Sequence, residues 1–144
     1  MRPFLLALAL IPLPALADPP QAMPGTPQAM LGTPLTASEF DTYATGKTLL
    51  YAEGGAAWGQ EQYLPDRRVL WAFTGQPCEY GIWYPDKGAI CFVYEGKPDP
   101  NCWQFYHGTQ GLVAQFLSGD GSGLLSEVGQ TTAPMNCPGP QVGV

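Results

Sequence analysis

The most constraining feature of the sequence is the even spacing of its turn signals. From Lys47 onward, clusters of Gly, Pro and Asp recur every 9 to 13 residues, and the segments between them are rich in aromatic and β-branched residues. This pattern is typical of an antiparallel meander, because short hairpin turns join antiparallel neighbours whereas parallel strands need long crossovers. We therefore predict eight strands, at about residues 47–53, 58–64, 68–74, 79–84, 89–95, 102–107, 111–117 and 124–128.

Eight strands of this length predict a mainly β fold, an antiparallel meander closed into a small lipocalin-like barrel, with an open sandwich as the alternative. Counting outward from the centre of each predicted turn pairs Trp83 with Ile90 and Trp71 with Gly81. Because strand side chains alternate between faces, these pairs sort the middle of the chain into two faces, and a shift by one residue would exchange them. The more aromatic face, which we predict to point inward, has Trp71, Phe73, Gly81, Trp83, Ile90, Phe92, Trp103 and Phe105, and the outward face has Leu70, Ala72, Tyr80, Ile82, Cys91, Val93, Cys102, Gln104 and Tyr106.

The N-terminus has the features of a signal peptide over residues 1–17. It contains Arg2, a short apolar core and an Ala-x-Ala cleavage site directly before Asp18. We therefore predict an exported protein, periplasmic or secreted. Outside this segment the sequence has no apolar run of 18 residues, so we expect no transmembrane anchor in the mature chain.

A linker and a short helix are predicted between the signal peptide and the strands. Residues 18–35 are rich in Pro, Gly and Thr and contain one heptad twice, which is typical of a disordered tether. Thr36 and Glu39 have the spacing of a capping box, and Gly46 follows where a helix would end, so we predict a helix at about residues 37–45. Residues 36–144 are expected to form a single β-domain.

The four cysteines predict two disulfides in an exported chain. Four cysteines allow three pairings, and hairpin counting favours one of them, because it places Cys91 opposite Cys102 on the outward face. Cys78 and Cys137 would then tie the C-terminal tail to the start of the fourth strand. The absence of a Cys-x-x-Cys pair gives no support to a redox motif or a thiolate metal site.

Signals for catalysis are sparse. The single histidine, His107, precedes Gly108 at a predicted strand end and is interpreted as a surface residue. No Gly-x-Ser-x-Gly motif occurs, and most of the aspartates lie at turns, which Asp favours for its own backbone geometry. We expect no enzyme activity, no cofactor and no metal site. A net charge of −6 without basic blocks also argues against nucleic acid as a partner.

The aromatic residues are the richest candidate for function. Trp71, Trp83 and Trp103, on the predicted inward face, would either line a ligand cavity or fill the barrel as a solid core. Arg67 and Arg68 form the only basic pair, which would either clamp a carboxylate or phosphate at the barrel rim or lie in a solvated turn.

A set of short motifs in a fixed order resembles small exported proteobacterial proteins of an uncharacterised family. The motifs are at residues 35–40 (LTASEF), 46–49 (GKTL), 63–67 (YLPDR), 81–83 (GIW), 90–92 (ICF) and 102–103 (CW). The resemblance implies a periplasmic β-domain and no particular activity. The Gly-x-Trp motif is also found in lipocalin-like barrels, on the first strand rather than the fourth, which gives an analogy of fold only.

These observations predict an exported, non-enzymatic barrel that binds a small apolar or amphipathic envelope molecule. The alternative is a protein-binding envelope factor, such as an inhibitor of an enzyme. A hollow interior lined by the tryptophans would favour the first interpretation over the second.

Overall fold

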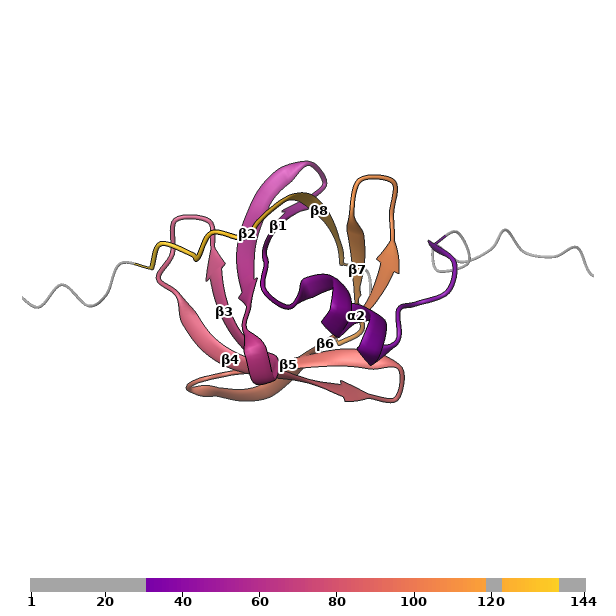
Figure 1. Cartoon of the computed structure of the whole chain (residues 1–144), viewed down its shortest axis with the longest axis horizontal. Coiled ribbons are helices and arrows are strands. Elements are labelled where there is room, and N and C mark those ends of the chain that lie inside the picture. Colours follow the sequence, from indigo (N-terminus) through magenta and orange to yellow (C-terminus); the bar gives the residue numbers. More distant parts are fainter. Residues whose placement is uncertain (1–30, 119–122, 138–144) are drawn as a thin grey trace, which may run out of the picture.

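The computed structural model of the chain describes residues 31–118 and 123–137, and the predicted signal peptide and most of the predicted linker lie outside these ranges. The eight strands form a closed antiparallel barrel in which each strand pairs with the next and the last pairs with the first (Figure 1). The prediction of an eight-stranded barrel is confirmed.

No helix within the described ranges is both long and apolar enough to cross a bilayer. The elements are α2 (Ala37–Ala44), β1 (Thr48–Glu53), β2 (Ala56–Tyr63), the single turn η1 (Pro65–Arg67), β3 (Arg68–Phe73), β4 (Glu79–Asp86), β5 (Ala89–Tyr94), β6 (Lys97–His107), β7 (Leu112–Phe116) and β8 (Leu124–Thr131).

The strand register differs from hairpin counting by two residues at two hairpins. Trp83 lies opposite Phe92 rather than Ile90, because the β4–β5 turn consists of Lys87 and Gly88, both with positive φ, as a tight two-residue hairpin requires. Gly81 lies opposite Val69 rather than Trp71. A shift of two residues keeps every side chain on its predicted face.

Two glycines on the inner wall leave room for large aromatic side chains. A Cβ atom at Gly59 would lie 2.7 Å from the ring of Trp71, and one at Gly81 would lie 2.7 Å from the ring of Tyr94. Gly81 thus does lie opposite a large side chain, as predicted, but that side chain is Tyr94 on β5 and not Trp71 on β3. These two glycines allow the rings of Trp71 and Tyr94 to pack directly against the backbone of β2 and β4.

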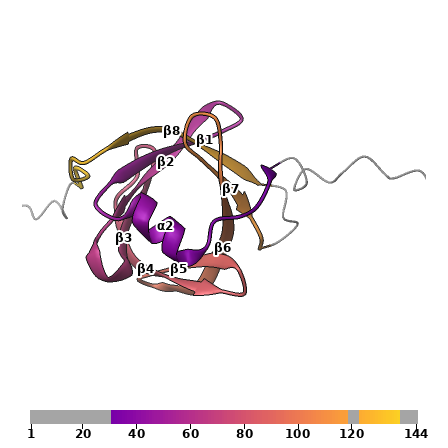
Figure 2. The same cartoon turned by 45° about the vertical axis from the view of Figure 1, so that its right-hand side comes forward.

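Helix α2 lies across one end of the barrel and closes it (Figure 2). Its residue Phe40 is fully buried, with ring centroids 5.5 Å from Tyr63, 5.3 Å from Trp83 and 4.4 Å from Phe105. An isolated helix of eight residues is unstable in water, so this packing holds the helix in place. Just before the helix, Leu35 is also buried, and its backbone N–H donates to the carbonyl of Phe105 at 2.7 Å.

The predicted capping box at the start of α2 is present. The N–H of Glu39 donates to Oγ1 of Thr36 at 3.3 Å, and the N–H of Thr36 donates to Oε2 of Glu39 at 2.8 Å. Replacing Thr36 with alanine is expected to lower the free energy of unfolding by about 1 kcal/mol, because one N-terminal N–H of the helix loses its acceptor. Urea denaturation measures this change, and a midpoint identical to that of the wild type would contradict the capping role.

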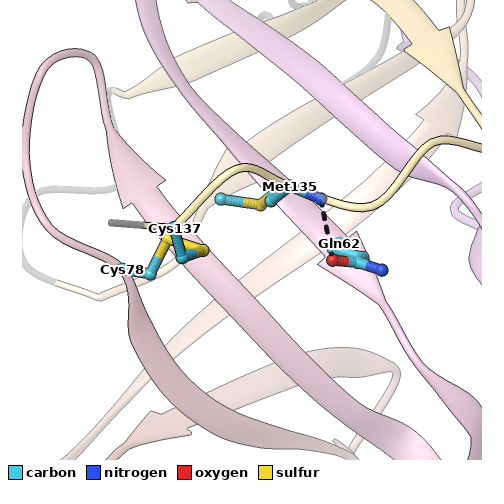
Figure 3. The surroundings of a disulfide bond; sticks show 4 residues. All are labelled: Gln62, Cys78, Met135 and Cys137. Atoms are coloured by element: carbon cyan, nitrogen blue, oxygen red, sulfur yellow. Dashed lines mark hydrogen bonds between the residues drawn. A yellow bond between two sulfur atoms is a disulfide. The ribbon is translucent and has the colours of Figure 1, made fainter. Parts of the chain in front are cut away.

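Both predicted disulfides are formed. Cys91 and Cys102 join β5 to β6 on the outer face, and Cys78 is bonded to Cys137. The segment after β8, residues 132–137, forms a strap that crosses the outside of the barrel (Figure 3). Besides the disulfide, two hydrogen bonds and one apolar contact hold the strap: Thr48 Oγ1 donates to the carbonyl of Ala133, Met135 N–H donates to Gln62 Oε1, and the Met135 side chain packs on Leu70 and Ala72.

Candidate ligand-binding cavity

The barrel encloses a cavity of about 280 Å³ at the end opposite α2. Its mouth lies where β1, β3, β5 and β7 end, and Glu53 and Phe73 are exposed there. Its floor is formed by Tyr63 and Phe105, which contact Phe40 of the helix on their other side. The described lining residues are Tyr51, Glu53, Trp58, Glu61, Tyr63, Trp71, Phe73, Phe92, Tyr94, Asn101, Trp103, Phe105, Ala114, Phe116, Gly123 and Leu125.

The cavity wall is largely aromatic, and its rings hold one another in place. Trp71 and Phe73 pack edge to face at 5.2 Å, Trp58 packs against Phe73 at 5.6 Å, and Trp103 packs on Phe116 at 4.7 Å. Such contacts favour a fixed wall shape, which lowers the entropy cost of binding a rigid ligand.

A buried carboxylate interrupts this aromatic wall. Glu61 is only 4% exposed, yet it lines the cavity between the floor and the mouth. Its Oε1 accepts a hydrogen bond from the hydroxyl of Tyr94 at 2.7 Å, and its Oε2 accepts one from the hydroxyl of Tyr63 at 3.0 Å. The hydroxyls of Tyr51 and Tyr63 lie 3.0 Å apart, and because Tyr63 donates to Glu61, Tyr51 is the donor in this pair.

Burial determines the acid–base properties of this network. Burial raises the pKa of Glu61 to about 7, against the opposing effect of the hydrogen bonds from Tyr94 and Tyr63. Burial also raises the pKa values of Tyr51, Tyr63 and Tyr94 well above the ordinary tyrosine value, so their hydroxyls remain donors at neutral pH. The charge of Glu61 therefore changes near neutral pH.

Of the three tryptophans that the sequence predicted as ligand-binding residues, two line the cavity and one does not. Trp71 and Trp103 line the cavity, together with Trp58. Trp83 does not line it, because its fully buried side chain lies at the closed end against Phe40.

The basic pair also lies at the closed end, away from the cavity. Asp66 and Arg67 have φ values of 62° and 58°, and this left-handed turn brings the Arg67 guanidinium to 4.9 Å from the centre of the Trp83 ring. Arg68 Nε donates to the carbonyl of Pro65 at 3.2 Å. Neither arginine is among the cavity-lining residues, so an anionic ligand in the cavity would not meet this pair.

An eight-stranded barrel with an interior of this kind is able to hold one small ligand. No family model, curated protein or solved structure matches the chain. The nature of a ligand must therefore be read from the cavity walls. Their area is mostly apolar, with Glu61 and its tyrosines as the main polar feature at depth.

The described residues offer little else for chemistry. They contain no group of three or more His, Cys, Asp or Glu side chains that could hold a metal ion. His107 is exposed at the end of β6, with its ring 6.1 Å from that of Tyr43. A second buried carboxylate, Glu127, lies outside the cavity and accepts from the Tyr43 hydroxyl and the Leu112 N–H, both at 2.8 Å, which ties α2 to the barrel wall.

Sequence reasoning missed Glu61, although a signal for it was present. Glu61 stands between Gln60 and Gln62, and such a polar run suggests a solvated strand. Extending the hairpin count across the turn at Pro65 would have placed Glu61 beside Trp71, its partner in the structure, and hence on the inward face.

Proposed function

We propose that this chain is an exported, non-enzymatic binding protein that holds one small apolar or amphipathic molecule inside its barrel. The observation that carries the proposal is the aromatic cavity of about 280 Å³ with a mouth at one end. A cavity of roughly 150 Å³ already accommodates benzene. The space here is nearly twice that, which suits a molecule with two fused rings and a short substituent.

Features of the chain outside the cavity support export. The leader of residues 1–17 has the composition of a signal peptide. The two disulfides are compatible with an extracellular or periplasmic location, because disulfides persist in oxidising compartments. An envelope binding protein would meet small amphipathic molecules in that setting.

Native mass spectrometry of protein recovered gently from the periplasm tests the proposal. The native mass is expected to exceed the denatured mass by a small-molecule increment. The denatured chain should begin at Asp18 and lie four hydrogens below the fully reduced mass, because both disulfides are formed. Equal native and denatured masses would overturn the proposal and direct the search to a protein partner.

A matched pair of variants locates the ligand. Ala114 lines the cavity and is buried, whereas Ala57 is exposed and does not line it. Ala114→Phe is expected to fill part of the cavity and remove the mass increment, and Ala57→Phe is expected to keep it. An increment that survives Ala114→Phe would place the ligand elsewhere on the molecule.

A further inference from the structure

The carboxylate of Glu61 has acceptor capacity left for a ligand. An ionised carboxylate can accept about four hydrogen bonds, two on each oxygen. In the described structure each oxygen accepts one, from Tyr94 and from Tyr63 respectively. Because Glu61 also lines the cavity, a donor group on a ligand would be able to reach the remaining positions.

The described surroundings of Glu61 supply hydrogen bonds but no positive charge. The ionisable groups that line the cavity with it are Glu53 and Tyr51 on β1, Tyr63 on its own strand β2 and Tyr94 on β5. Among these described lining residues there is no Lys, Arg or His. Charges buried in proteins are normally paired, because desolvation of an unpaired charge is costly. A cation on the ligand would complete this site.

The aromatic wall adds a second attraction for a cation. Trp58, Trp71, Trp103 and Phe92 line the same cavity, and the faces of aromatic rings attract cations, most strongly for Trp. The same rings provide flat surfaces for stacking an apolar ligand body. An anionic ligand would meet the opposite situation, since it would place a second negative charge beside Glu61 in a chain whose net charge is −6.

We infer that the cavity selects a cationic amine carried on a flat apolar body of about two fused rings, with the Glu61 carboxylate as counter-ion and the tryptophans as the stacking wall. This inference rests on the proposed ligand-binding function and specifies its ligand class. A primary ammonium group would donate to the open positions of Glu61 while its ring system fills the aromatic part of the cavity.

Three indoles that differ in the charge of one substituent provide the test: tryptamine (cationic), tryptophol (neutral) and indole-3-acetate (anionic). Isothermal titration calorimetry at pH 8 with the whole mature protein measures their affinities. Tryptamine is expected to bind about tenfold to a hundredfold more tightly than tryptophol, the range that a charge-assisted hydrogen bond supplies, and indole-3-acetate is expected to bind most weakly.

Matched variants test whether Glu61 causes this preference. Glu61→Gln keeps the size of the side chain and removes its charge, so it should reduce tryptamine affinity to that of tryptophol and leave tryptophol affinity within about twofold. Glu127→Gln removes a carboxylate that is also buried but lies outside the cavity, so it should preserve the preference for tryptamine.

This experiment distinguishes a failure of the amine inference from a failure of the proposed ligand-binding function. If tryptophol or indole-3-acetate binds as tightly as tryptamine, or if Glu61→Gln keeps the preference, the amine inference is wrong while ligand binding stands. If none of the three indoles binds to the wild type, both the inference and the cavity as a binding site for molecules of this size are wrong.

Discussion

Replacing Phe40 with alanine is expected to lower the free energy of unfolding by about 3–5 kcal/mol, the range observed when a large buried aromatic side chain is truncated. Phe40 is fully buried and packs against Tyr63, Trp83 and Phe105 at the closed end of the barrel. It is also the main buried anchor of α2, which is too short to persist without tertiary contacts. The variant therefore loses apolar contacts and releases the helix that closes the barrel.

Urea denaturation at constant pH measures this effect as a lower midpoint. Ser38→Ala serves as the control, because Ser38 is an exposed residue of the same helix and its replacement should change stability by less than about 0.5 kcal/mol. If Phe40→Ala and Ser38→Ala unfold at the same midpoint, α2 contributes nothing to the core in solution. In that case Tyr63 and Phe105 would be the true end of the barrel interior.

Glu61→Gln is expected to change how stability depends on pH, by roughly 3 kcal/mol between pH 4.5 and 8. Burial raises the pKa of Glu61 from 4.5 to about 7, so the folded protein holds this proton more tightly than the unfolded chain does. The stabilisation that the proton provides is complete below about pH 4.5. It is lost progressively as the pH rises through 7, where the folded state must hold an ionised carboxylate. The glutamine side chain carries no such proton and lacks this dependence.

The measurement is the difference in unfolding free energy between the wild type and Glu61→Gln at pH 4.5, 6 and 8. The variant should gain stability relative to the wild type as the pH rises, with most of the gain below pH 8. Glu95→Gln, which removes an exposed carboxylate, corrects for the general effect of one lost negative charge. Parallel curves for the wild type and Glu61→Gln would show that Glu61 is not buried in solution.

The fold was predictable because the information that specifies it is local. Turn residues mark the strand ends, and the period of two in strand side chains survives an error of two residues in register. For this reason the predicted pairing of Cys91 with Cys102 and the inward position of Trp71 are confirmed although Gly81 and Trp83 have other partners.

The hollow interior was not predictable in the same way. Whether aromatic rings fill a barrel depends on where small residues stand on neighbouring strands, and Gly59 and Gly81 provide this space from β2 and β4. The floor depends on α2, which meets the barrel through contacts between residues far apart in sequence. Counting within hairpins contains no information on either kind of contact. It also gave no information on whether Arg67 and Arg68 would lie at the open or the closed end of the barrel.

The Cys78–Cys137 disulfide closes a covalent ring around the barrel wall. The chain from Cys78 to Cys137 includes β4 to β8, and the strap continues over β1, β2 and β3 back to the start of β4 (Figure 3). This ring consists of peptide bonds and one disulfide. Separation of β8 from β1 would break the hydrogen bonds between these two strands but would leave the covalent ring intact. Under the proposed function, we therefore expect the ligand to enter and leave through the mouth, because sideways separation of β8 from β1 is restrained while the Cys78–Cys137 disulfide is oxidised.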